Sequence, residues 1–264
     1  MAAEELGGLA VDRFPGSLPQ VVVAHGVLDR AATFRRLARA LAPAAVVLYD
    51  RCGYARSRGC AARGLADHVE HLRALIGTTP SMVVGHSLGG VLALALATNP
   101  PPGLLAVSVY EAPLPGHGWW GPWELTPADA LRAQLDEEET GRLAEDFLRR
   151  AMGAAFSTLP PGFVADRRAE GRVFVRELAE LALGLLPLDL VRLAVRVQAG
   201  IGEFADQRHR ASFATLLATP GVEGYCIPGA PHGVHLWRPG AWAQALRSFL
   251  ERCSAASAAG QPRR

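Results

Sequence analysis

Short apolar runs alternate with helical patterns along this chain, and no other feature of the sequence restricts its fold as strongly. Runs rich in β-branched residues indicate buried strands at residues 21–24, 46–49, 82–84 and 104–110. Apolar residues at helical spacing lie between these runs, at residues 33–41, 65–76 and 87–97. Strands that alternate with helices through short connections are typical of a mostly parallel sheet covered by helices on both faces.

The alternation stops after residue 113 and resumes near residue 192. Between these points, three tryptophans (Trp119, Trp120 and Trp123) precede an acidic helix expected at residues 127–151 and a second helix at about 163–186. Beyond them the pattern predicts strands at residues 193–197 and 222–227, and helices near 207–218 and 239–253.

The sequence therefore predicts an α/β protein with a mostly parallel sheet of about seven or eight strands. Residues 1–113 and 192–253 would form the core, and residues 114–191 a helical cap inserted after the strand that ends near Tyr110. Residues 254–264 are small and polar, and we expect them to form a disordered tail.

All 27 basic residues of the chain are arginine, so several chemistries that require lysine are excluded. The chain can form neither a Schiff base with pyridoxal phosphate nor a lysine-containing phosphate loop. A Ser–Lys catalytic dyad is excluded for the same reason. The formal net charge of +2 gives no reason to expect a nucleic-acid partner.

The cysteines and the uncharged stretches bear on the compartment. Cys52, Cys60, Cys226 and Cys253 show no C-x-x-C spacing, which predicts free thiols in a reducing compartment. Residues 74–110 carry no Asp, Glu, Lys or Arg, but prolines and glycines divide them into pieces that suit a buried core better than a membrane span. Because the N-terminus also lacks the pattern of a signal peptide, we expect a soluble cytoplasmic protein with no membrane partner.

Gly85-His86-Ser87-Leu88-Gly89 follows a β-branched strand and opens an apolar helix. This G-x-S-x-G pattern demands a sharp strand-to-helix turn that exposes the serine, and the glycines allow the two elements to approach closely. A glycine-rich loop that binds phosphate at a helix N-terminus is the alternative, but no charged residue nearby supports it.

On these residues the sequence resembles the α/β-hydrolase family over nearly the whole chain. His25-Gly26 resembles the family's oxyanion loop, and residues 50–57 resemble its D-x-x-G-x-G-x-S segment, with Ala55 in place of the second glycine. Residues 228–232 resemble the P-G-x-G-H run that carries the catalytic histidine, with Pro231 in place of glycine.

The resemblance implies a nucleophile and a base for acyl transfer. Ser87 would be the nucleophile and His232 the base, with His235 as a rival that we expect to be a pocket or supporting residue. His25 and His86 would shape the turns. The backbone N–H groups of Val27 and Leu88 would form the oxyanion hole, and neither a metal nor a cofactor is implied.

The third member of the triad is left open among three carboxylates. If Gly202-Glu203 matches the family's Gly-Glu pair, the usual acid position falls on Ala205, between Glu203 and Asp206. Some family members instead place the acid after the preceding strand, where Glu111 stands in a Tyr-Glu-Ala-Pro run. We prefer Glu111, because a carboxylate at the end of an apolar strand could orient the imidazole and stabilise its cation.

The function implied is hydrolysis of an ester, a lactone or a related small carbonyl compound with an apolar group. The cap would cover Ser87, and its tryptophans would contact that group or pack within the cap itself. Carbon–carbon bond hydrolases, cofactor-free haloperoxidases and hydroxynitrile lyases share the same residue set and stay open as alternatives. A non-catalytic ligand receptor on the same fold is a further alternative.

Overall fold

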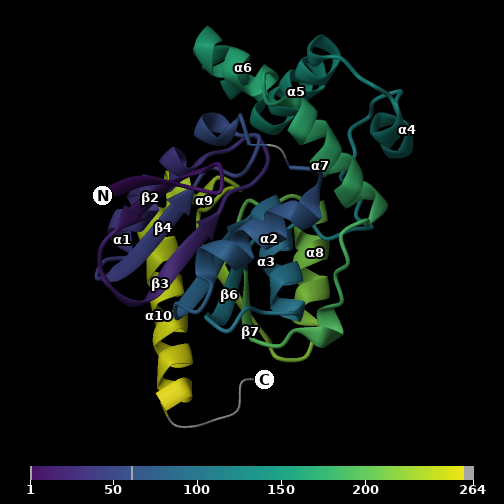
Figure 1. Ribbon diagram of the computed structural model, residues 1–264. Helices are drawn as coiled ribbons and strands as arrows, with labels where there is room; N and C mark the ends of the chain where they lie inside the picture. The colour runs from purple at the N-terminus through teal and green to yellow at the C-terminus, as the bar shows by residue number, and fades with distance from the viewer. Residues whose placement is uncertain (1, 61, 259–264) are drawn as a thin grey trace.

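An eight-stranded sheet forms the centre of the computed structural model, which describes residues 2–60 and 62–258 (Figure 1). The strand order is β1-β2-β4-β3-β5-β6-β7-β8. The strands are β1 (Ala2–Leu6), β2 (Leu9–Phe14), β3 (Ser17–Ala24), β4 (Ala44–Tyr49), β5 (Ser81–His86), β6 (Leu104–Tyr110), β7 (Arg196–Gly202) and β8 (Val222–Ile227). β2 is antiparallel to both of its neighbours, and every pair from β4 to β8 is parallel. The predicted mostly parallel α/β sheet is confirmed.

The sequence patterns did not predict two of the strands, and they placed a third incorrectly. β1 and β2 form an edge hairpin whose charged residues break up any apolar run, so no buried-strand pattern marks them. β7 begins at Arg196 and runs to Gly202, whereas the prediction stopped at residue 197. Its second half carries Gly200 and Gly202, where a Cβ atom would overlap the side chains of Tyr225 and Tyr110. The glycines allow close packing, but they interrupt the run of large apolar residues by which a buried strand is recognised in a sequence.

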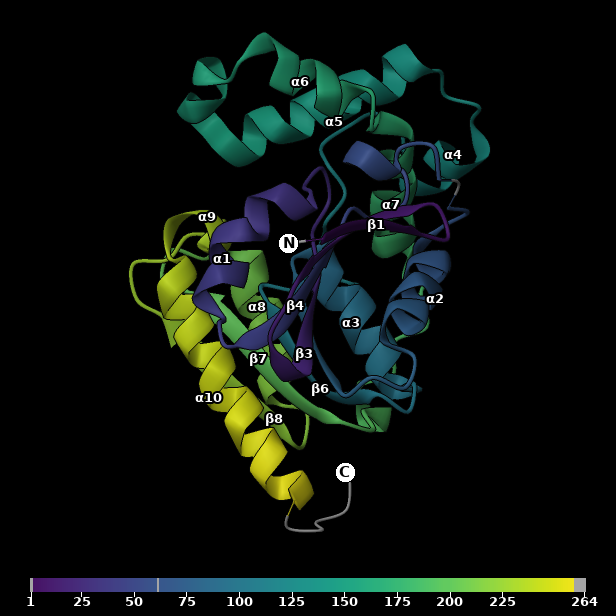
Figure 2. The same cartoon turned by 60° about the vertical axis from the view of Figure 1, so that its left-hand side comes forward.

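Helices cover both faces of the sheet (Figure 2). α1 (Arg35–Ala40) and α10 (Pro239–Ala258) pack against one face. α2 (Leu65–Ile76), α3 (Leu88–Thr98) and α8 (Gln207–Leu217) pack against the other. α10 continues to Ala258, so the predicted disordered tail is wrong for residues 254–258, and residues 259–264 lie outside the described residues.

In the described chain, four α-helices lie between β6 and β7 and stand at the carboxyl ends of the parallel strands (Figure 1). They are α4 (Pro127–Arg132), α5 (Glu137–Met152), α6 (Pro161–Arg168) and α7 (Gly171–Leu183). Each of the two long helices predicted here is therefore divided in two. The first division falls at Asp136, which caps α5 reciprocally with Glu139, a start signal that the continuous acidic pattern concealed. Four-residue helix α9 (Val234–Trp237) lies just before α10.

Cys52 and Cys60 form a disulfide, so the prediction of four free thiols is wrong for this pair. The intervening chain turns back on itself through hydrogen bonds from the backbone N–H groups of Gly53 and Cys60 to the carbonyl of Ser57. These turns bring the two Cα atoms to 5.1 Å, a span suited to a disulfide. Cys226 and Cys253 are free. Among the described residues, no helix is long and apolar enough to cross a membrane.

Candidate active site

Ser87 occupies the sharp turn between β5 and α3, with φ 53° and ψ −127°. A non-glycine residue is strained in this region, so the surrounding packing must hold it there. A Cβ atom on Gly85 would lie 2.5 Å from the Cα atom of Gly90, and one on Gly89 would overlap the carbonyl of Ala24. The glycines on either side of Ser87 therefore permit the turn that the G-x-S-x-G pattern predicted.

The segment after β3 lies directly against this serine. A Cβ atom on Gly26 would come within 2.9 Å of the Cβ atom of Ser87. Val27 follows Gly26, and Leu88 is the first residue of α3, where a backbone N–H has no partner within the helix. The two residues expected to form the oxyanion hole therefore lie in segments on either side of Ser87.

His232 and Glu111 meet at the same edge of the sheet. Nδ1 of His232 donates a hydrogen bond of 2.6 Å to Oε2 of Glu111. Oε1 of Glu111 accepts a bond of 2.9 Å from the N–H of Gly202, and the side chain is buried. Because Nδ1 must carry the proton in this bond, Nε2 of a neutral His232 is a proton acceptor.

The pKa of Glu111 lies below its usual value. Burial acts to raise it, but the hydrogen bonds from His232 and from the backbone of Gly202 outweigh burial. The carboxylate is thus ionised at neutral pH and can stabilise a positive charge on the imidazole.

The other two candidate acids make different contacts. Asp206 is exposed and caps α8, where its side chain accepts a hydrogen bond from the backbone N–H of His209. Oε2 of Glu203 accepts a bond of 2.6 Å from the N–H of Gly229. Ala205, at the family's usual acid position, offers no carboxylate. The structure brings Glu111, and neither Asp206 nor Glu203, into hydrogen-bond contact with His232.

His209 is a residue of this site that the sequence reading missed. Its ring lies 4.5 Å from the ring of His232, and its Nδ1 lies 3.0 Å from Asp206 and 4.0 Å from Glu111. Burial and the neighbouring His232 lower its pKa to about 4. Its position three residues after a helix-capping aspartate was the available signal, because that spacing turns the ring back toward the cap.

Three further histidines lie close to the site, and two of them hold backbone groups there. Nε2 of His86 donates a hydrogen bond of 2.8 Å to the carbonyl of His232. Nε2 of His25 accepts one of 2.8 Å from the N–H of Arg51. His235, the rival base, stacks on Phe34 at 4.1 Å and lies 3.2 Å from the carboxylate of Asp29. Its contacts are therefore with a different carboxylate from the one that holds His232.

Comparison with known proteins places these observations in a family. The sequence profile described as "Alpha/beta hydrolase family" matches residues 21–245. The chain belongs to the alpha/beta hydrolase family. This family assignment agrees with the sheet order, the strand-to-helix turn at Ser87 and the helices inserted after β6.

Two relatives of this hydrolase are described as lipases. A monoacylglycerol lipase of Mycolicibacterium smegmatis is 28% identical over 221 residues, which cover 80% of this chain and 71% of that protein. Lipase LipV of Mycobacterium tuberculosis is 31% identical over 162 residues, 60% of each chain. An alpha/beta hydrolase structure from Sphaerobacter thermophilus superposes with a TM-score of 0.70 at 24% identity, over 92% of this chain and 96% of that one.

In this hydrolase the fully buried Arg51 joins the segment after β3 to α7. Its Nε donates to the carbonyl of His25 at 2.9 Å, and its Nη2 donates to that of Gly26 at 3.1 Å. The same guanidinium pairs with both carboxylate oxygens of Glu177 in α7. Burial opposes ionisation of Glu177, but Arg51 and His68 lower its pKa to about 2. The backbone beside Ser87 is therefore held by an ion pair that an inserted helix completes.

The three tryptophans lie mainly within the packing of the inserted segment. Each indole N–H has an acceptor: the carbonyl of Leu114 for Trp119, that of Leu125 for Trp120 and the carboxylate of Asp146 for Trp123. Trp119 also lies 4.9 Å from the ring of His209, which itself neighbours His232. These contacts favour the interpretation of Trp120 and Trp123 as packing residues.

A cavity of about 420 Å³ lies beside the segment that carries His232. Its walls come from Phe204, Gly229, Pro231, Trp237 and Arg238. Ser87, Glu111 and His232 do not line it, so this cavity is adjacent to the candidate triad rather than above it.

Proposed function

We propose that this hydrolase cleaves carboxylic esters, or related carbonyl compounds such as lactones, with an apolar group, through an acyl-enzyme on Ser87. The observation that carries the proposal is the short bond between His232 and Glu111 at the sheet edge where Ser87 occupies its strained turn. Acyl transfer requires this combination of an exposed hydroxyl, a base and a group that orients the base.

In the proposed reaction, Nε2 of His232 removes the proton of Ser87 as Oγ forms a bond to the carbonyl carbon. The carbonyl π electrons move to oxygen, and the N–H groups of Val27 and Leu88 stabilise this oxyanion. Glu111 stabilises the imidazolium. When the tetrahedral intermediate collapses, the bond to the alcohol oxygen breaks and His232 returns its proton to that oxygen.

Water then replaces the alcohol and the same steps release the acid. His232 takes a proton from water as its oxygen attacks the acyl carbon, and the bond to Oγ breaks. The proton passes to Oγ and regenerates the enzyme. No other donor of protons or electrons is needed, so the proposed residues account for the whole cycle.

The apolar nature of the substrate is supported by two observations. Two relatives, at 28% and 31% identity, are described as lipases. Trp119 packs on His209, whose ring lies beside that of His232, and so brings a large apolar side chain close to the proposed base. We therefore expect esters of medium-length acyl chains to be better substrates than acetate esters.

A fluorophosphonate probe tests the nucleophile. We expect covalent labelling of the native protein, located to Ser87 by peptide mass mapping and lost in Ser87→Ala. Turnover of p-nitrophenyl esters of increasing acyl length should be lost in the same variant. An unlabelled native protein that turns over none of the esters would overturn the proposal and favour a non-catalytic member of the fold.

A further inference from the structure

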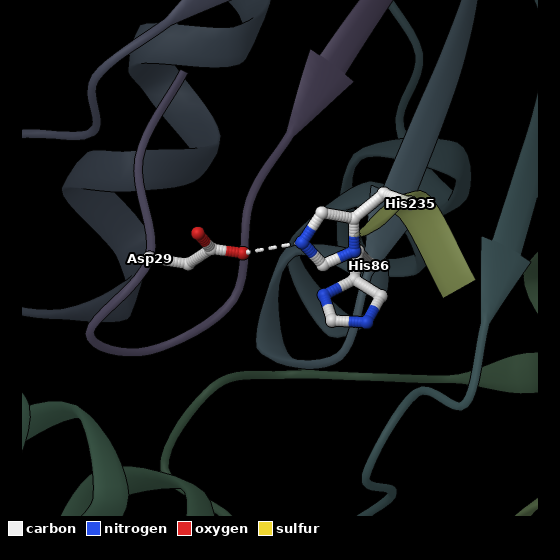
Figure 3. Close-up of side chains that lie close together, drawn as sticks. All are labelled: Asp29, His86 and His235. Carbon is white, nitrogen blue, oxygen red and sulfur yellow. Dashed lines mark ion pairs between the residues drawn. The ribbon is translucent and has the colours of Figure 1, made fainter. Parts of the chain in front are cut away.

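Behind the turn at Ser87, three side chains gather from separate parts of the fold (Figure 3). Asp29 belongs to the segment after β3, His86 ends β5, and His235 lies in α9. One donor atom from each lies within 4.8 Å of the donor atoms of the other two. The acyl-transfer reaction proposed above uses none of these side chains as a reactant.

Asp29 directs one carboxylate oxygen toward the imidazole of His235 (Figure 3). Its Oδ1 accepts hydrogen bonds from the backbone N–H of Arg30 at 2.9 Å and from Oγ1 of Thr33 at 2.7 Å. Its Oδ2 lies 3.2 Å from Nε2 of His235. The Asp29 side chain is 17% exposed.

His86 is held in a state suited to ligation. Its Nε2 faces a carbonyl, which can only accept, so Nε2 carries the proton and Nδ1 keeps a free lone pair. Within the described part of the chain, Nδ1 is buried and has no hydrogen-bond partner. An imidazole whose N–H donates to a backbone carbonyl while its other nitrogen is free has the arrangement of a metal-ligating histidine.

His235 completes the group. It is 3% exposed and stacks on Phe34, and within the described residues neither of its ring nitrogens makes an aligned hydrogen bond. Two atoms that share one tetrahedral zinc ion lie about 3.4 Å apart, given metal–ligand distances of about 2.0–2.2 Å. The separation of 3.2 Å between Nε2 of His235 and Oδ2 of Asp29 is close to that value.

We propose that Asp29, His86 and His235 form a binding site for a divalent transition-metal ion of the zinc type, with water as the fourth ligand. Two imidazoles and one carboxylate suit such an ion rather than Mg²⁺ or Ca²⁺. Binding releases the proton that Nε2 of His235 carries in the protonated form. The donor atoms now lie within 4.8 Å of one another, so the ion would draw His86 inward by up to roughly 1.4 Å to reach the ligand separation of about 3.4 Å.

The ion would act as a structural link and not as a reactant. It would join the segment after β3, the end of β5 and α9, and His86 already holds the carbonyl of His232. The site therefore fixes the segment that carries the proposed base without contacting the reacting atoms. Its test does not depend on the proposed hydrolase activity, because the readout is metal binding.

A second group of donors, Glu111, His209 and His232, must be distinguished from this one. We would titrate protein freed of metal by chelation with Zn²⁺ in a calorimeter, and compare it with Asp29→Asn, His235→Gln and Glu111→Gln. His71→Gln serves as a matched control outside both groups. We expect one equivalent of Zn²⁺ to bind the wild type, Glu111→Gln and His71→Gln alike. In Asp29→Asn and His235→Gln the affinity should fall at least 10-fold.

Two results would overturn the site. One is a folded wild-type protein that binds no stoichiometric Zn²⁺, and the other is affinity that survives in Asp29→Asn and His235→Gln. If either variant fails to fold, the imidazole ¹⁵N resonances of the wild type decide. Zn²⁺ should shift those of His86 and His235 and leave that of His209 in place, and the reverse pattern would assign the ion to the other group.

Discussion

Glu111 and Ser87 both have a positive φ, of 47° and 53°. Residues with a Cβ atom avoid this left-handed region at a cost of about 1–2 kcal/mol. Such strain persists only where the surroundings impose it, and here Glu111 N–H bonds to the carbonyl of Gly200 and Ser87 N–H to that of Tyr110. The two residues at the centre of the proposed reaction are thus held by the ends of neighbouring strands.

Replacing the carboxylate of Glu111 tests its role directly. Glu111→Gln keeps the shape of the side chain but loses the charge that fixes the tautomer of His232. By the behaviour of other serine triads, kcat for a p-nitrophenyl ester should fall roughly 10³–10⁴-fold. Asp206→Asn and Glu203→Gln make the same chemical change nearby and should keep kcat within about 10-fold of the wild type. A large loss in Asp206→Asn with little in Glu111→Gln would reverse the assignment.

Single functional residues could be predicted from the sequence where a known motif requires a given residue type at a given position. Ser87, His232 and Glu111 could be proposed because each follows a strand in a recognisable run. His209 could not, since its approach to His232 depends on how α8 packs against the sheet. The Cys52–Cys60 disulfide was missed because local turns, and not the spacing of the cysteines, bring the pair together.

Among the elements, α7 is attached to the core by buried apolar side chains and by three carboxylates. Glu177 pairs with Arg51, and Glu180 accepts a hydrogen bond of 2.7 Å from the N–H of Leu65. Glu170, at the start of the helix, accepts bonds from Arg30 and from the N–H of Ala55. An inserted helix thus depends on charged groups of the core, and the core depends on it in turn.

Because the ion pair of Arg51 and Glu177 is buried, two similar Glu→Gln substitutions should lower the free energy of unfolding by unequal amounts. Glu177→Gln leaves the guanidinium of Arg51 buried without its counter-charge, so the free energy of unfolding should fall by about 3 kcal/mol. Glu138→Gln removes an exposed partner of Arg168 and should cost less than about 1 kcal/mol. Urea unfolding of both variants makes the comparison. Equal and small losses would show that Arg51 finds another partner.

The disulfide predicts a second effect on the same region of the core. It closes a loop with a sequence separation of eight residues, so the double variant Cys52→Ser, Cys60→Ser should lose about 2 kcal/mol of unfolding free energy. Thiol titration of the denatured, unreduced wild type should detect only Cys226 and Cys253. Detection of all four thiols before reduction would contradict the pairing.

For the whole molecule, His25 and His209 link stability to pH. Burial and Arg51 lower the pKa of His25 to about 4, and burial and His232 do the same for His209. In the unfolded chain both regain the ordinary value of 6.5, so the unfolded state binds more protons between about pH 4 and 6.5. Their contribution is complete above pH 6.5 and is lost as the pH falls.

We therefore expect the free energy of unfolding, measured in urea, to decrease from about pH 7 to about pH 5, by up to about 1.4 kcal/mol per pH unit for each histidine. His209→Gln should make this decrease shallower. The contribution of Glu177, whose pKa is lowered to about 2, is lost only below its ordinary value of 4.5, so the two effects separate. Parallel profiles for the wild type and His209→Gln would contradict the linkage.

The sheet could be predicted from the sequence because buried parallel strands form continuous apolar runs. The edge hairpin and β7 could not be fully predicted, since one is charged and the other contains glycines that accommodate Tyr110 and Tyr225. The division of the inserted helices depended on a cap at Asp136 that an unbroken acidic run concealed.

The attachment of α7 to Arg51 and to the N–H of Leu65 makes this inserted helix costly to move. Moving this helix away would leave the guanidinium of Arg51 buried without its carboxylate partner and the N–H of Leu65 without its acceptor. In the proposed reaction, any acyl chain or alcohol that contacts this helix would therefore meet a stationary wall. A stationary wall imposes a sharp upper limit on substrate size, so activity along a series of acyl lengths should end abruptly instead of declining gradually.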